Sequence, residues 1–595
     1  MQAPFLVLTW PRPAASGRAA AQSLGERLAR AGWSTTHSGD GFIVWGRASR
    51  SAPVVIDDDL LVIGRRFPRL GAARTSPTGS ATLHERARAV ADGGWGPFVA
   101  LLRDPATDAW NLYRDPSGAV DVFTWSLDDL QVTTSGLHRL PPGLLPARLG
   151  LDWTVIADLL RRPASRGARS GLASVHWVPP GALQPAGAAD SQATLLWRPS
   201  DWAFTAEDGH ADVEARLGDT LRSVVAAQLG PYGRVATEAS GGLDSSIVNA
   251  ALAQAGLAPK VAAALHYVGD RREADERAWA AALCAHAALP FTPVERVSGD
   301  VDPIRDFAAL SRDVRPAFGA LDAARDRDTA ARLRTARVEA LVTGKGGDAL
   351  FFQMPSARVV ADLWRAKGWT ALAHPLNGQV ARWLRRSVWA VWREAFAAPA
   401  PLAGRPARFA GPALRETPPA PPHPWLADLE AVPPGKRVQI LALTTSLSGQ
   451  GSHRRGRVAD IVQPLLSKPM MELCLSIPSW ELVRQGRDRG LAREAFASWL
   501  PPAVAQRRSK GALTSLYARR AAASAPALRE HLLDGVLVDA GLLDRRAVEA
   551  ALDPDDLIRR LDGVDLIAAA ALESWVRYWQ TRVPDAPDGV RWGYR

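Results

Sequence analysis

A glycine-rich turn between a strand and a helix constrains this chain more than any other feature. Residues 235–239 (Val-Ala-Thr-Glu-Ala) form a β-compatible run, and Ser-Gly-Gly-Leu-Asp-Ser-Ser, residues 240–246, then leads into a helical pattern. A turn at this place directs backbone N–H groups and the positive end of the helix dipole toward one point. The sequence therefore predicts an anion site at the turn, most naturally one for phosphate.

The turn also carries the side chains that a phosphate and its metal ion require. Gly241 and Gly242 allow positive φ and close backbone approach. Asp244, next to Leu243 at the helix start, can hold Mg²⁺ against the phosphate charge. The hydroxyl donors are those of Ser240, Ser245 and Ser246. The following helix is predicted to be amphipathic. Its apolar face consists of Ile247, Val248, Ala251, Leu252 and Ala255.

A second glycine-rich turn follows another apolar run, residues 340–342. Its sequence, Thr-Gly-Lys-Gly-Gly-Asp, places Gly344, Gly346 and Gly347 ahead of Asp348. In a doubly wound sheet, turns at the carboxyl ends of parallel strands open into one crevice. We therefore expect Asp348 to share Mg²⁺ with Asp244 and the glycines to lie at the nucleotide. An ordinary glycine turn is the alternative.

Three further positions are candidates for the same site. Leu265, in a predicted strand over residues 260–268, is expected to contact the nucleotide. Asp275 and Glu276 are expected in the first turn of the next helix, either as site residues or simply as charges that the helix dipole favours. Lys510, one of only six lysines, is expected to reach the α-phosphate or a developing oxyanion. A solvated surface lysine is its alternative.

Composition sets the broad class. With 595 residues, 47% of them hydrophobic, the chain should form two large or three smaller globular domains. No apolar run reaches 18 residues, so no membrane span is expected. Cys284 and Cys474 are too few for a disulfide framework, which indicates buried thiols in a reducing cytoplasm. The net charge of +11 reflects either a nucleic-acid or acidic-peptide partner or, because the arginines are scattered, only genome composition.

The N-terminal residues, 1 to about 200, are rich in short strand patterns separated by turn residues. Gly96-Pro97-Phe98 with Asp104, followed by Arg114-Asp115 and Gly118, resembles the glutaminase half of asparagine synthetases. Those enzymes use an N-terminal cysteine whose free amine acts as its base. Here Gln2 stands at that place, and the region contains no cysteine. It is therefore interpreted as a structural relic or a docking surface.

The first turn matches the Ser-Gly-Gly-x-Asp-Ser signature of PP-loop ATP pyrophosphatases. Downstream, Pro-x-Leu, Ile-Pro, Arg-x-x-x-Arg, Leu-Pro and Arg-x-x-Lys-Gly follow in the order found in asparagine synthetases, so the chain resembles the asparagine synthetase B superfamily along nearly its whole length. This implies a two-domain α/β protein that uses ATP and Mg²⁺. Residues 1–205 would be an Ntn-amidotransferase-like α+β sandwich without its nucleophile. Residues 206–595 would be the PP-loop synthetase domain, a parallel sheet flanked by helices with a helical C-terminal region.

Within that superfamily the chain looks most like the lasso peptide cyclases, the macrolactam synthetases. Lys345 and Ala349 stand where asparagine synthetases carry glutamates, so the ammonia-handling acid is missing. The resemblance implies an ATP-dependent, AMP-forming carbon–nitrogen ligase. It would adenylate an Asp or Glu side chain of a leader-cleaved precursor peptide, whose own N-terminal amine then closes the ring. Expected partners are that core peptide and, transiently, the leader peptidase or leader-binding protein of the pathway, with nucleic acid not expected.

Several points stay open at this stage. The base that deprotonates the amine is not identified; His453 is one candidate, and the arginine-rich stretch to Arg457 could line a peptide pocket. Residues 397–425, dense in proline and alanine, are predicted to be a surface loop or spacer. Three alternatives remain for the function. They are a small-molecule amide or β-lactam synthetase, a PP-loop tRNA-modifying enzyme, which a pI near 10.2 favours, and a scaffold that only binds nucleotide.

Overall fold

The computed structural model describes residues 4–12, 15–47, 54–57, 59–70, 82–137, 140–146, 148–161, 169–189, 192–203, 212–269, 275–296, 302–398, 408–448, 453–507, 513–560 and 562–582. Gln2 and Lys510, on which two of the expectations above depend, lie outside these residues.

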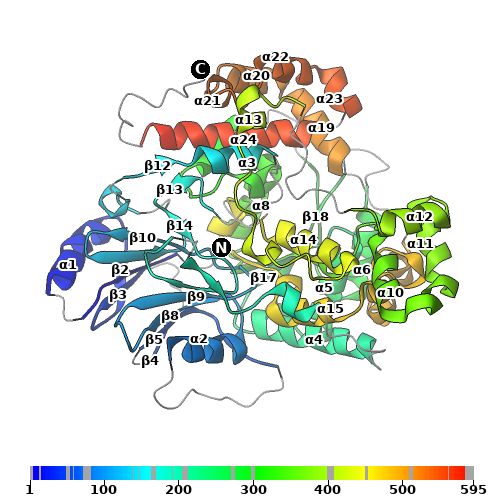
Figure 1. Ribbon diagram of the computed structural model, residues 1–595, viewed down its shortest axis with the longest axis horizontal. Coiled ribbons are helices and arrows are strands. Elements are labelled where there is room, and N and C mark those ends of the chain that lie inside the picture. The colour runs from blue at the N-terminus through cyan, green and yellow to red at the C-terminus, as the bar shows by residue number, and fades with distance from the viewer. Residues whose placement is uncertain are drawn as a thin grey trace.

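Two antiparallel sheets form the N-terminal part (Figure 1). The first has the strand order β14 (His176–Trp177), β10 (Phe123–Leu127), β11 (Leu130–Thr134), β1 (Phe5–Thr9), β3 (Phe42–Gly46), β2 (Ser34–Gly39). The second has the order β16 (Thr194–Leu195), β15 (Ala182–Pro185), β9 (Trp110–Arg114), β8 (Phe98–Arg103), β5 (Leu60–Gly64), β4 (Val54–Asp57). Short pairs β6 (Phe67–Pro68) with β7 (Gly94–Trp95) and β12 (Gly150–Leu151) with β13 (Leu172–Ala173) complete this part.

The two sheets pack face to face, with one helix on each outer face. Val7 of β1 and Leu101 of β8 belong to the cluster between the sheets. Their alternate neighbours point outward, so Leu8 packs with α1 (Ala15–Arg30) and Ala100 packs with α2 (Leu83–Asp92). A capping box between Thr82 and Glu85 fixes the start of α2.

A parallel five-stranded sheet forms the centre of the remaining chain. Its order is β19 (Phe291–Val294), β18 (Val261–Tyr267), β17 (Val235–Glu238), β20 (Ala340–Val342), β21 (Asp460–Val462). One face is covered by α4 (Val213–Leu229), α5 (Leu243–Gln254) and α6 (Arg277–His286), and the other by α8 (Ala323–Thr335). Because the chain leaves β17 toward β18 and returns on its other side as β20, the topological switch point lies between β17 and β20.

Beyond β20 the chain is mainly helical. Before β21 come α9 (Gly347–Leu350), α10 (Arg358–Lys367), α11 (Leu376–Leu384), α12 (Val388–Ala395), α13 (Pro412–Glu416) and α14 (Pro434–Ser448). After it come α15 (Lys468–Ser476), α16 (Ser479–Leu482), α17 (Gly490–Ala495) and α18 (Pro502–Ala505). The last group is α19 (Leu513–Ala523), α20 (Ala525–Leu533), α21 (Val536–Asp539), α22 (Arg545–Ala551), α23 (Pro554–Arg560) and α24 (Gly563–Gln580).

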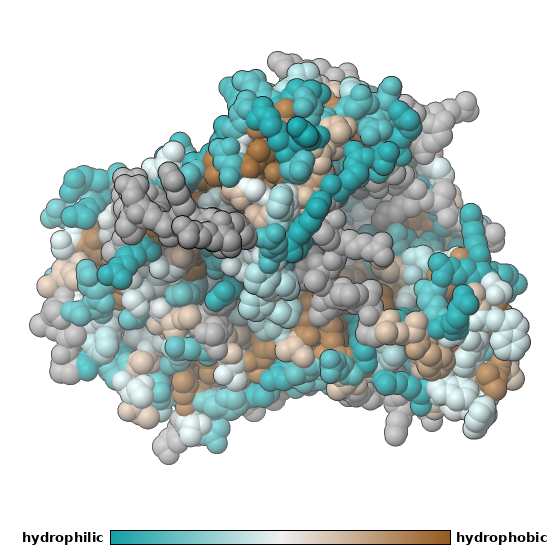
Figure 2. All heavy atoms as spheres, turned by 45° about the horizontal axis from the view of Figure 1, so that its top comes forward, coloured by the Kyte–Doolittle hydropathy of each residue, from teal (hydrophilic) through white to brown (hydrophobic). Residues whose placement is uncertain are grey.

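The last helices share a hydrophobic core with the N-terminal sheet. Trp575 and Trp579 of α24 belong to the same buried cluster as Leu8 of β1. Both indole N–H groups donate to the Asp313 carbonyl oxygen, at 2.9 and 3.1 Å, and α24 also packs on α3 (Trp153–Arg161) and α7 (Pro303–Leu310) (Figure 1). The outer surface of this helical group is mainly hydrophilic in Figure 2. Strand β1 and helix α24, which are far apart in the sequence, therefore belong to one hydrophobic core.

Two expectations from the sequence are wrong. Helix α5 is not amphipathic: residues 243–252 are all buried, because α4, α6 and α18 surround it. The described part of the proline-rich segment, 408–425, is not a surface loop. Phe409, Leu414 and Trp425 are at most 3% exposed, and the Trp425 indole donates to the Pro180 carbonyl oxygen at 2.9 Å. This segment fills the space between the N-terminal strands and the last helices.

Two other expectations agree with the structure. Both cysteines are buried free thiols, and burial raises the pKa of Cys284 to about 11 and that of Cys474 to about 12. Among the described helices, none is long and apolar enough to cross a membrane.

Candidate active site

The first glycine-rich turn joins β17 to α5 at the switch point. Gly241 has φ +78°, and a Cβ atom there would lie 2.9 Å from the Glu276 carbonyl oxygen, so only glycine fits. A Cβ at Gly242 would meet only the Ser240 hydroxyl, at 3.3 Å. Space therefore remains in front of Gly242, the residue that caps the N-terminus of α5.

Hydroxyl groups hold this turn in shape. Ser240 Oγ lies 2.7 Å from Ser245 Oγ and accepts from the Gly242 N–H at 3.2 Å. The Ser246 hydroxyl donates to the Gly242 carbonyl oxygen at 2.8 Å and is fully buried. Ser240 is exposed at the mouth of the turn. Of the predicted hydroxyl donors, Ser240 is thus the one that faces solvent, while Ser246 braces the loop from inside.

Sequence reasoning missed Asn249, which fastens the strand to the helix. Its Nδ2 donates to the carbonyl oxygens of Glu238 and Ser245, at 3.0 and 2.9 Å, and the Thr237 hydroxyl donates to its Oδ1 at 2.6 Å. An asparagine seven residues after Gly242, within the apolar run of the helix, was the available signal. Glu238, unexpected on a buried strand, accepts from Arg325 of α8 at 2.7 Å.

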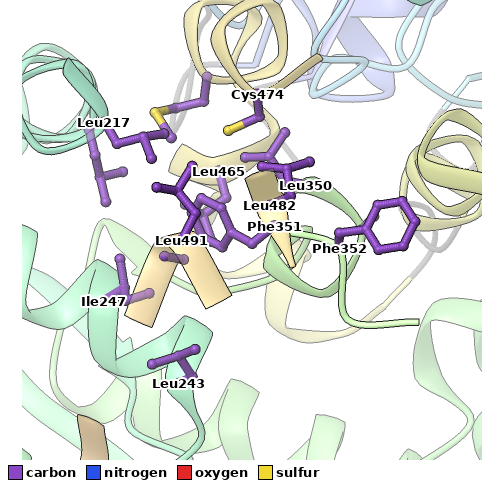
Figure 3. Close-up of a cluster of buried hydrophobic side chains, with 14 of the residues drawn as sticks. Leu217, Leu243, Ile247, Leu350, Phe351, Phe352, Leu465, Cys474, Leu482 and Leu491 are labelled. Atoms are coloured by element: carbon purple, nitrogen blue, oxygen red, sulfur yellow. The ribbon is translucent and has the colours of Figure 1, made fainter. Parts of the chain in front are cut away.

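The second turn packs directly onto the first. A Cβ at Gly344 would come 2.5 Å from the Ser245 nitrogen, and one at Gly347 would come 2.6 Å from the Asp244 side chain. Gly346 has φ +97° and lies against Leu466. Gly344 and Gly347 therefore allow the two turns to touch, and Gly346 allows the second turn to pack on Leu466. Figure 3 shows the apolar support beneath them, with Leu350 and Phe351 of the second turn near Leu465 and Leu491.

Arg489 joins the two predicted metal ligands. Its Nη1 donates to Asp244 Oδ2 at 2.7 Å and to Asp348 Oδ1 at 3.1 Å. Its Nε and Nη2 donate to Asp488 Oδ2 at 3.0 and 2.7 Å. The Arg489 side chain is 4% exposed and that of Asp348 is 52% exposed. Burial acts to lower the pKa of Arg489, but the carboxylates of Asp244 and Asp488 outweigh it and raise that pKa. The structure thus brings the two aspartates together, as expected, around a cation that the sequence did not reveal.

A second arginine from the same C-terminal region locks the first turn. Arg507 Nη1 donates to the Gly241 carbonyl oxygen at 2.9 Å, its Nη2 donates to Glu276, and its guanidinium lies 4.2 Å from the Trp279 ring centre. The expectation for the acids is wrong: α6 begins at Arg277, so Glu276 precedes the helix instead of lying in its first turn. Its carboxylate binds the arginine that holds the turn.

The strand beside β17 presents its backbone to the turn. The Leu265 carbonyl oxygen accepts from the Ala239 N–H at 2.9 Å, while the Leu265 side chain is 4% exposed and packs in the cluster on the α8 side of the sheet. The next residue, His266, lies with Nδ1 2.7 Å from the Ala239 carbonyl oxygen. Burial lowers the pKa of His266, which keeps this contact between neutral groups near pH 7.

The two candidates for amine activation and peptide binding have other roles. His453 is buried, its Nδ1 accepts from the Gly456 N–H at 3.0 Å, and burial lowers its pKa far below the ordinary value. Arg454 and Arg455 bind carboxylates of the part of the chain that contains the parallel sheet. They donate to Asp306 and Asp326, each at 2.9 Å, and so tie this segment to α7 and α8.

The residues at the switch point fit a nucleotide-bound Mg²⁺. Among the described residues no cluster of three metal-binding side chains exists. Mg²⁺, however, is commonly held by one or two carboxylates together with substrate phosphates and water. Asp244 and Asp348 offer two carboxylates around one point, and the Arg489 nitrogen between them shows that this point accommodates positive charge.

A parallel sheet with a glycine turn and a carboxylate pair at its switch point defines an α/β nucleotide-dependent enzyme. Residues 216–577, 362 of the 595, match the Asparagine synthase family. The chain belongs to the asparagine synthase family, whose members are ATP-dependent, AMP-forming carbon–nitrogen ligases that typically use Mg²⁺. The chain is accordingly an ATP-dependent carbon–nitrogen ligase. No curated protein matches it.

Proposed function

We propose that the chain is a macrolactam synthetase of lasso peptide biosynthesis. It adenylates an Asp or Glu side chain of a leader-cleaved precursor peptide and lets the N-terminal amine of that peptide close the ring. The observation that carries the adenylation step is the pairing of Asp244 with Asp348 at the turn of β17. The observation that favours a peptide over ammonia is the second turn, where Lys345 and Ala349 replace the glutamates of asparagine synthetases.

In this reaction the turn, the two aspartates and Lys510 would each have a separate role. The turn at the N-terminus of α5 holds phosphate oxygens at the positive end of that helix, and Asp244 and Asp348 hold Mg²⁺. Lys510 supplies a point charge to the α-phosphate or to the oxyanion that forms during amine attack. ATP supplies the leaving group that a carboxylate lacks.

We further propose that residues 1–205 form a glutaminase-like domain without its nucleophile, and residues 206–595 the synthetase domain. Contacts already hold the two together. Lys468 of α15 donates to the carbonyl oxygens of Ala91 and Gly94, and the Trp197 indole donates to Glu472 at 3.0 Å. These contacts support the proposal that the N-terminal domain stabilises the synthetase domain. We propose that it also offers a surface to the leader peptidase or leader-binding protein of the pathway.

The test uses purified full-length protein with ATP, Mg²⁺ and the leaderless peptide encoded beside it. Loss of one water from the peptide, with AMP released, is the expected result. AMP without peptide dehydration would refute the macrolactam assignment and move the substrate to a small molecule. If no carboxylate elicits AMP, adenylation itself is wrong for this chain.

A further inference from the structure

We propose that Arg489 is a positioning residue that occupies the divalent-cation position while no nucleotide is bound, so that the metal enters only together with ATP. The proposal rests on the proposed function, because it concerns the same pair of carboxylates. Its subject, however, is the protein without substrate.

The first argument is the position of one nitrogen atom. Nη1 of Arg489 lies within 3.1 Å of an oxygen from each of Asp244 and Asp348. The Asp244 side chain is 11% exposed. The Asp348 side chain, by contrast, is 52% exposed. A carboxylate as buried as that of Asp244 requires a positive charge beside it, because burial removes the water that would otherwise solvate it. In the structure the guanidinium supplies that charge.

The second argument is the anchoring of the same side chain. Its Nε and Nη2 form a fork on Asp488, so Nη1 can leave the pair without releasing the arginine. The backbone is fixed as well. Arg489 has φ +56° and donates its N–H to the carbonyl oxygen of Phe352, which has φ +66° and follows the helix that carries Asp348. The segment that carries Asp348 thus also holds the backbone of Arg489.

Together these contacts predict an order of binding. A free divalent ion must compete with a tethered cation of the same chain and therefore binds weakly. A nucleotide changes this balance, because its phosphates both add ligands for the metal and accept the displaced Nη1. The same bridge keeps the two turns together until the nucleotide arrives.

The experiment measures Mn²⁺ binding to the nucleotide-free protein by electron paramagnetic resonance, with the melting temperature recorded with EDTA or with Mn²⁺. In Arg489→Gln we expect Mn²⁺ affinity to be at least about tenfold higher than in the wild type, the equivalent of one charge-assisted hydrogen bond. We also expect a lower melting temperature in EDTA that Mn²⁺ restores. Adding Asp348→Ala should abolish the gained binding.

Arg493→Gln is the matched control. Arg493 has a similar exposure, 9%, and shares the Asp488 carboxylate at 3.2 Å, but it also donates to the carbonyl oxygens of Asp488, Ala505 and Arg507 and not to Asp244 or Asp348. Its loss should lower the melting temperature without Mn²⁺ rescue. If Arg489→Gln does not fold, Arg489→Met serves, because methionine keeps much of the apolar stem of arginine without its charge, so Mn²⁺ affinity should again rise.

Wild-type Mn²⁺ affinity in a folded Arg489 variant, or equal rescue of the Arg493 control, would overturn the proposal. ATP–pyrophosphate exchange with the core peptide is measured separately on the wild type. Absence of exchange would count against the proposed function alone, since the Mn²⁺ titrations contain neither nucleotide nor peptide.

Discussion

Replacing Gly344 by alanine should force the two turns apart. The new Cβ atom would lie 2.5 Å from the Ser245 nitrogen and 2.6 Å from the Ser245 Cα. Ordinary contact begins at 3.4 Å, so the first turn of α5 must retreat by about 0.9 Å (3.4 − 2.5 Å). Both neighbours are backbone atoms and cannot rotate away. Overpacking of this kind costs about 1–3 kcal/mol, and a shift near 1 Å at reacting groups reduces turnover by roughly 100-fold.

Two assays check this expectation. The melting temperature should fall by roughly 2–3 °C if the cost is ~2 kcal/mol and the synthetase domain unfolds as one unit, and ATP–pyrophosphate exchange should fall by about two orders of magnitude. The control is Gly378→Ala on α11, where a Cβ meets no atom within 4 Å. There alanine should stabilise the helix by up to ~1 kcal/mol. A Gly344→Ala protein with wild-type melting and exchange would refute the claim that the glycine is needed for contact between the turns.

Further predictions concern the same region and its support. Asp244→Ala and Asp348→Ala should each abolish AMP formation while circular dichroism shows an intact fold; turnover in either would exclude the metal role. Arg507→Gln removes the bond to the Gly241 carbonyl oxygen and should raise the KM for ATP by about tenfold, the loss of one charge-assisted hydrogen bond, with a smaller change in kcat. Burial lowers the pKa of Lys436 to about 7, so between pH 7 and 10 the unfolded chain binds more protons there than the folded one and stability rises with pH. Urea denaturation of Lys436→Met should lack that rise, and an unchanged pH profile would show that the amine stays charged in the fold.

The sequence determined the local parts of the site. Gly241 and Gly346 stand where the backbone has a positive φ. Asp244 and Asp348 follow these glycines within the same short segments. The β-compatible run at 235–239 and the apolar run at 340–342 each precede a glycine turn, as parallel strands covered on both faces do.

Only the tertiary structure decided which side chains neutralise the two aspartates and which hold the backbone of the first turn. Arg489 lies 245 residues beyond Asp244, and Arg507 lies 266 residues beyond Gly241. Both arginines stand in motifs of the sequence, Arg-x-x-x-Arg and Arg-x-x-Lys-Gly, but no local pattern indicates which distant carboxylate or carbonyl group each of them binds. The burial of α5 on every side and the core shared by α24 and β1 likewise depend on residues that are distant in sequence. Periodicity reports which face of an element is apolar, whereas partners distant in sequence decide how many faces are covered.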